Sequence, residues 1–135
     1  MSTRRLTDEV CAADVMMRRF VSAAPEDTLG ELAERLAAAD AGSALVVEFG
    51  HLSGILTSRD IVRAIADRVH PSEGTVREWM TNAPATASPE LPVEEAARLM
   101  LNGAFHHLPV VEEERPVGVV GLRTALSSLR RLPGW

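Results

Sequence analysis

The feature that most constrains this chain is an internal repeat. Sliding the 135-residue sequence by 64 positions brings matching residues into register without a gap. The matches are Met16 with Met80, Pro25-Glu26 with Pro89-Glu90, Val46-Val47-Glu48 with Val110-Val111-Glu112, Gly54 with Gly118, and Arg59 with Arg123. Two copies of one unit are therefore expected at 13–68 and 77–132, with a linker at 69–76 and a tail at 1–12.

Each copy predicts the element order β-α-β-β-α. An extended start and a proline precede a stretch of apolar residues at helical spacing. Thr28 with Glu31 fits a capping box for the first of these helices, and Pro92 fits the first helical position of the second. The expected hairpin strands are 44–49 and 54–57, joined by a turn at 50–53, and 108–112 and 117–120. Closing helices are expected over 58–68 and over 122 to about Arg131.

One such unit is too small to bury its own sheet. The two copies are therefore expected to pack face to face about a pseudo-two-fold axis, giving one α+β module with two equivalent clefts. A chain of this length can bury a core without disulfides or a metal.

Composition and charge exclude several classes of function. The net charge of −5 and the lack of long basic runs argue against a nucleic-acid partner. No apolar stretch approaches the ~20 residues of a bilayer span, and Met1 to Val10 is unlike a signal peptide, so a cytoplasmic protein is expected. The lone Cys11 falls in the expected tail, and the histidines lack metal-ligand spacing. No nucleophile–base pair, metal set or pair of carboxylates indicates an enzyme.

The candidate site lies where a strand meets the closing helix of the first copy, in the segment Gly54-Ile55-Leu56-Thr57-Ser58-Arg59-Asp60-Ile61. Asp60, expected to be exposed in the first helical turn, could accept two hydrogen bonds from a ribose diol. The hydroxyls of Thr57 and Ser58 and the free N–H groups of the helix start suit a phosphate or ribose oxygen. The alternative is purely structural: Ser58 caps the helix and Asp60 complements its dipole.

The tandem repeat and this segment resemble the cystathionine-β-synthase-type (CBS) domain family over residues 13–132. Val15-Met16, Trp79-Met80 and Phe105 to Val111 support the resemblance. It implies a regulatory module that binds AMP, ADP, ATP, S-adenosylmethionine or a related adenosine ligand between the copies. The residues that it assigns to the adenine are Val21, Ser22, Ala44 and Leu45, while His106 and His107 would reach the phosphate side from the opposite copy.

The resemblance also favours a homodimer, since family members commonly pair through equivalent helices. Apolar positions expected near the surface are Ile61 with Ile65 and Leu126 with Leu129. An effector protein is expected as well, since a chain without a fused catalytic or DNA-binding domain needs a partner to transmit its signal. The sequence does not identify that effector.

The second copy departs from the motif. Gly121, Leu122 and Thr124 stand where the first copy has Thr57, Ser58 and Asp60. The second cleft is therefore expected to bind weakly or to be filled by side chains, so that each chain takes one tight ligand. The same departure supports an alternative function, a ligandless dimerisation or protein-docking module.

Overall fold

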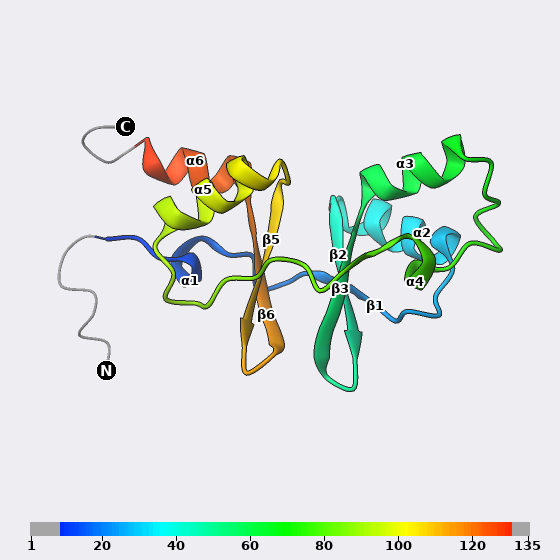
Figure 1. Cartoon of the computed structure of the whole chain (residues 1–135), viewed down its shortest axis with the longest axis horizontal. Helices are drawn as coiled ribbons and strands as arrows, with labels where there is room; N and C mark the ends of the chain where they lie inside the picture. The colour runs from blue at the N-terminus through cyan, green and yellow to red at the C-terminus, as the bar shows by residue number, and fades with distance from the viewer. Residues whose placement is uncertain (1–8, 131–135) are drawn as a thin grey trace. The chain divides into compact units, whose positions relative to one another are not determined.

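The computed structural model describes residues 9–130, and its elements follow the repeat (Figure 1). The first copy contains α1 (Ala12–Val15), β1 (Val21–Ala23), α2 (Leu29–Ala39), β2 (Ser43–Glu48), β3 (His51–Thr57) and α3 (Ser58–Ala66). The second contains α4 (Val76–Trp79), β4 (Thr81–Asn82), α5 (Val93–Gly103), β5 (His107–Glu112), β6 (Arg115–Gly121) and α6 (Leu122–Leu129). The α+β class with two repeats is confirmed. Arg131, the expected end of the last helix, lies outside the described residues, as do residues 1–8 of the expected tail.

The compact units of the fold divide the chain differently from the two repeats. Among the described residues, unit 1 comprises 9–18, 86–112 and 117–130, and unit 2 comprises 19–85 and 113–116. The start of each repeat thus belongs to the unit that is built mainly from the other repeat. The short helix α1 lies in unit 1, whereas α4 and β4 lie in unit 2.

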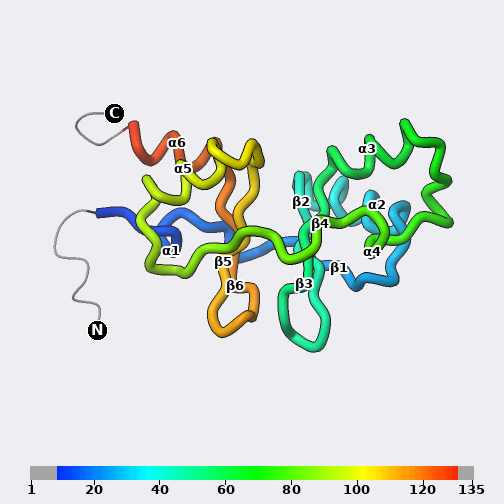
Figure 2. Tube along the Cα trace, in the orientation of Figure 1, coloured from blue at the N-terminus to red at the C-terminus, as the bar shows by residue number. Residues whose placement is uncertain are grey.

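Unit 2 contains a four-stranded sheet in the order β1-β2-β3-β4 (Figure 2). Strands β1 and β2 are parallel, and β3 is antiparallel to both β2 and β4. Helices α2 and α3 pack on one face of this sheet. The buried core between them comprises Ala23, Leu29, Leu32, Leu36, Ala44, Val46, Leu56, Ala64, Val76 and Met80.

The hairpin of unit 2 turns earlier than the sequence predicts. Phe49 and Gly50 both have positive φ angles, 53° and 80°, and they form a two-residue turn that matches strand twist. Strand β3 therefore begins at His51, so the expected turn at 50–53 was wrong. The β-pairing extends to His51, which lies opposite Glu48, and to Leu52, which lies opposite Val47.

Unit 1 is built on the β5–β6 hairpin, which packs against α1, α5 and α6. Single bridges extend it on both sides, from Met17 to Val119 and from Ala87 to Val110. Cys11 was expected in a tail, but its side chain is buried and its backbone bridges to Pro92. The buried core comprises Ala12, Ala87, Val93, Ala96, Ala97, Met100, Leu108, Val110, Val120, Ala125 and Leu129.

Local signals at the helix starts are confirmed in one copy and shifted in the other. The Thr28 hydroxyl accepts from the Glu31 N–H at 3.1 Å, and the Glu31 carboxylate accepts from the Thr28 N–H at 2.9 Å. This is the predicted capping box. Pro92 is the residue before the helix rather than its first helical residue, because α5 begins at Val93.

Two structural absences hold for the described residues. Between residues 9 and 130, no helix combines the length and the apolar character needed to cross a bilayer. The same part of the chain contains no group of three His, Cys, Asp or Glu side chains placed to hold a metal ion.

Candidate functional site

The junction between β3 and α3 is closed by a capping box of Thr57 and Asp60. The Asp60 carboxylate accepts from the Thr57 N–H at 2.9 Å and from the Thr57 hydroxyl at 3.1 Å. In return, the Asp60 N–H donates to the Thr57 hydroxyl oxygen at 3.3 Å. Thr57 is therefore the cap, and Ser58 is the first helical residue, which corrects the alternative reading of Ser58 as the cap.

Asp60 is buried, contrary to the expectation that it is exposed. The residue is 7% exposed, and its two carboxylate oxygens have different environments. Oδ2 accepts both hydrogen bonds from Thr57. Among the described residues, Oδ1 accepts only from Arg63, at 3.3 Å, and the Arg63 side chain is 66% exposed. Because the Arg63 partner is largely in solvent, screening weakens this ion pair, so Oδ1 is the oxygen at which a ligand hydroxyl could compete.

Two contacts from neighbouring strands position this junction. The Ser58 N–H donates to the Gly42 carbonyl oxygen at 3.0 Å, which ties the first turn of α3 to the start of β2. At the other end of the motif, a β-carbon on Gly54 would lie 2.7 Å from the Met80 sulfur. The motif glycine therefore allows the segment from 80 to 82 to approach β3 closely.

The four residues assigned to the adenine lie on β1 and β2, next to the junction, in two rows across the sheet. Ser22 pairs with Leu45, and Leu45 pairs with Ile55. Val21 pairs with Ala44, which also pairs with Leu56, a core residue. Because side chains alternate along a strand, the first row shares the face of Thr57, whereas the second faces α2 and α3.

Because of this alternation, the four side chains differ in whether a ligand could contact them. Ala44 is fully buried in the core beneath the helices, and Val21 packs against that core. Ser22 is exposed, and Leu45 is buried on the opposite face. Ser22 and Leu45 are therefore the pair whose side chains share a face with Thr57.

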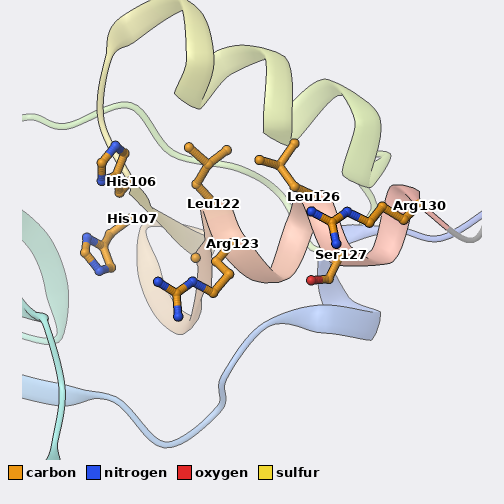
Figure 3. A pocket seen from close by; sticks show the side chains of 8 residues that line it. His106, His107, Leu122, Arg123, Leu126, Ser127 and Arg130 are labelled. Carbon is orange, nitrogen blue, oxygen red and sulfur yellow. The ribbon is translucent and has the colours of Figure 1, made fainter. Parts of the chain in front are cut away.

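His106 and His107 belong to unit 1 and accompany the junction of the second copy. They line a pocket of about 520 Å³ at the start of α6, together with Gly121, Leu122, Arg123, Leu126, Ser127 and Arg130 (Figure 3). The expectation that the second cleft binds weakly or is filled by side chains stays a prediction. Burial lowers the pKa of His107 below its ordinary value of 6.5, and electrostatic repulsion from the neighbouring His106 lowers it further.

The second junction has the same backbone contact as the first but lacks its side-chain cap. The Leu122 N–H donates to the His106 carbonyl oxygen at 2.9 Å, just as Ser58 does to Gly42. Gly121 precedes α6 without any side-chain cap, and the first turn of the helix contains no acid. The sequence predicted the missing groups, but it gave no signal for the pocket, which depends on how α6 and β5 pack.

Together, these features define a tandem repeat protein in which each copy has the order α-β-α-β-β-α, with candidate binding residues at its strand-to-helix junctions. The CBS domain model matches the chain twice, at residues 12–67 and 76–131. The chain therefore belongs to the CBS-domain family, which confirms the resemblance seen in the sequence.

Curated relatives differ in how much of their length this chain covers. YhcV of Bacillus subtilis is 30% identical over 109 residues, which are 81% of this chain and 78% of that protein. CBSCBSPB1 of Arabidopsis thaliana is 34% identical over 103 residues, which are 76% of this chain but 19% of that protein.

Two solved structures with this fold were determined with ligands. The CBS domain pair of protein MJ0100, in complex with 5-methylthioadenosine and S-adenosyl-L-methionine, has a TM-score of 0.80 at 28% identity, covering 90% of this chain and 96% of that one. PAE2072 from Pyrobaculum aerophilum, complexed with AMP, has a TM-score of 0.81 at 26% identity, covering 91% of this chain and 100% of that one.

Proposed function

We propose that this protein is a regulatory module that binds an adenosine ligand at the β3–α3 junction. The ligand class comprises AMP, ADP, ATP, S-adenosylmethionine and related compounds. The observation that carries the proposal is the retention of Thr57, Ser58 and Asp60 at one junction of a CBS pair. Related pairs of known structure hold 5-methylthioadenosine with S-adenosyl-L-methionine, or AMP.

The chemistry of Asp60 supports a ribose contact. Its Oδ2 is fixed by two hydrogen bonds from Thr57, so the carboxylate is already oriented before a ligand arrives. Its Oδ1 has one long contact to an exposed arginine, Arg63. A ribose hydroxyl would displace Arg63 at low cost and form a hydrogen bond to a charged acceptor, which contributes about 1.5–3 kcal/mol.

The assignments around Asp60 complete the proposed site. Ser22 and Leu45 would contact the adenine through side chains, while Val21 and Ala44 would contribute the backbone of the same strands. The hydroxyl of Ser58 would serve a phosphate or ribose oxygen. We assign His106 and His107 to the phosphate side of an anionic ligand.

A regulatory module acts through a second protein. We propose that the chain acts as a homodimer in the cytoplasm and that ligand binding alters its interaction with an effector protein. A ligand can alter this interaction only if it binds two conformations of the protein with different affinities.

A second function, a ligandless docking module, is favoured by one observation. The capping box alone accounts for Thr57 and Asp60, since each satisfies the other without a ligand. In that case the two residues stabilise α3 and nothing more.

A thermal-unfolding panel separates the two functions. Adenosine, AMP, ADP, ATP and S-adenosylmethionine are added to the full chain at matched ionic strength. A ligand present at 100 times its Kd should add about 2.7 kcal/mol to the free energy of unfolding. A clear rise in midpoint with at least one of these supports the sensor, and no change with any of them up to millimolar concentration supports the docking module.

A further inference from the structure

The backbone of β1 is tied to α2 by a single arginine. The Arg35 Nη1 group donates to the Ser22 carbonyl oxygen at 2.8 Å, and its Nη2 group donates to the Asp27 carboxylate at 2.6 Å. The same carboxylate oxygen of Asp27 accepts from the Ala24 N–H at 2.9 Å. Arg35, Asp27 and the backbone of Ser22 and Ala24 therefore form one connected set of hydrogen bonds, the Arg35 clamp.

The charges of the clamp determine what it can contribute. Partial burial acts to raise the pKa of Asp27, but the hydrogen bonds from Arg35 and from the Ala24 N–H outweigh burial and lower that pKa below its ordinary value of 3.8. The Arg35 and Asp27 side chains are 43% and 26% exposed, so solvent screens their attraction and the pair adds little to overall stability. A planar guanidinium group donates in fixed directions, however, so it restricts where the Ser22 carbonyl group can lie.

The strand that the clamp holds has few other supports. Strand β1 has three residues and lies at the edge of its sheet, where β2 is its one partner strand among the described residues. Arg35 contacts the middle residue, Ser22. Val21 and Ser22 are the two residues of this strand that the proposed adenine site uses. The clamp therefore acts at the part of β1 on which that site depends.

The second copy lacks the clamp, and its equivalent of β1 is less regular. Leu91 and Leu99 stand at the two positions that carry the charges of the clamp. Where β1 forms three parallel pairs with β2, the second copy has one isolated bridge, from Ala87 to Val110. Pro109 adds to this difference, because it has no N–H to donate to the ladder. The continuous strand thus occurs in the copy that has the clamp.

We propose that Arg35 is a positioning residue that holds β1 in the conformation that binds the adenine group of the ligand. This inference rests on the proposed adenosine site. Arg35 extends from α2, which packs on the face of the sheet opposite to the Ser22 side chain, so it supports the strand without occupying the ligand side. Without the clamp, a smaller fraction of molecules has β1 in the binding conformation, and the apparent affinity falls in proportion.

Two measurements on the full chain test this role, both well below the unfolding midpoint. The first is calorimetric titration with AMP, or with the member of the ligand panel that binds most tightly if AMP does not bind. Arg35→Met should weaken binding by about three- to tenfold. Adding Asp27→Asn to Arg35→Met should weaken binding no further, because the two side chains belong to one clamp. The second is amide hydrogen exchange without ligand, which should become faster at residues 21–24 in Arg35→Met.

Arg98→Met is the matched control. Arg98 lies on α5, the corresponding helix of the second copy, and forms an exposed ion pair with Glu94. This variant should keep the wild-type ligand affinity and the wild-type exchange at residues 21–24. A wild-type chain that binds no member of the panel would refute the adenosine site and, with it, the binding role of Arg35. If the wild type binds, the role of Arg35 alone is overturned when folded Arg35→Met matches Arg98→Met in ligand affinity or in exchange at residues 21–24.

Discussion

The sulfur atom of Met80 lies against Gly54 so closely that a β-carbon on residue 54 would come within 2.7 Å of it. The second copy repeats this relationship, with the Met16 sulfur 2.6 Å from the β-carbon position of Gly118. In both cases the start of one repeat packs onto the hairpin of the other. The glycine that opens the ligand motif is therefore required by packing, whatever its relation to a ligand.

Gly54→Ala should destabilise the protein. The new methyl group would meet the Met80 sulfur and, at 2.8 Å, the Thr81 carbonyl oxygen, which belongs to the backbone and cannot rotate away. We expect a loss of about 1–3 kcal/mol in the free energy of unfolding, measured with urea.

The control is Gly121→Ala. Apart from its two chain neighbours, no heavy atom of residues 9–130 lies within 4 Å of a β-carbon at residue 121, and its φ of −88° suits any residue. This variant should stay within about 0.5 kcal/mol of wild type. Equal losses in the two alanine variants would contradict the packing role of Gly54.

Asp60→Ala should have two separable effects. Loss of the capping box should reduce the free energy of unfolding by about 0.5–2 kcal/mol. Loss of the charged ribose acceptor should also weaken adenosine-ligand binding by about tenfold or more. Both are measured on one preparation, by urea unfolding and by calorimetric titration of the ligand that the panel identifies.

Glu31→Ala is the matched control for this variant. Glu31 occupies the same position in the capping box of α2, but it is not part of the candidate site. The Glu31→Ala variant should lose about as much free energy of unfolding as Asp60→Ala does, but it should keep the ligand affinity of the wild type. If folded Asp60→Ala binds as tightly as Glu31→Ala, Asp60 has only the structural role.

The sequence predicts the longer elements of this fold, but not the short α1, α4 and β4, because local signals mark only the longer ones. The Thr28–Glu31 cap and the repeated hairpins are of this kind. Tertiary environment is different: nothing local shows that Cys11 and Asp60 are buried, or that the pocket beside Gly121 stays open. Leu129 was also expected near the surface, as part of a dimer face, but it is fully buried in the core of unit 1.

His107 makes stability depend on pH. Burial lowers its folded-state pKa below 6.5, so the unfolded chain binds more protons in the window just below that value. The free energy of unfolding should therefore fall as the pH drops through this window. The other titratable or charged groups of the pocket are His106, Arg123 and Arg130. Urea unfolding at pH 7.5 and pH 5.5 should show a smaller difference for His107→Gln, and an unchanged difference would exclude His107 as the cause.

An apolar stripe on α3 should mediate the proposed homodimer. Val62 is 65% exposed and Ile65 is 55% exposed, one turn apart on the helix. We expect light scattering at tens of micromolar protein to give the mass of a dimer. Ile65→Asp should give a monomer with unchanged circular dichroism, because it places a charge in the stripe at a side chain that is already 55% exposed. A wild-type monomer would refute the dimer, and a dimeric Ile65→Asp would exclude this stripe.

Restoring the first-copy motif in the second copy should stabilise α6. In Gly121→Thr/Thr124→Asp, the threonine would cap α6 and the aspartate would occupy the position that Asp60 has on α3. The new capping box should raise the free energy of unfolding by about 0.5–2 kcal/mol, measured with urea. Gly121→Thr/Thr124→Asn keeps the hydroxyl cap without the carboxylate, so it should gain less. Equal stability of the Asp variant and the wild type would contradict this role of the capping box.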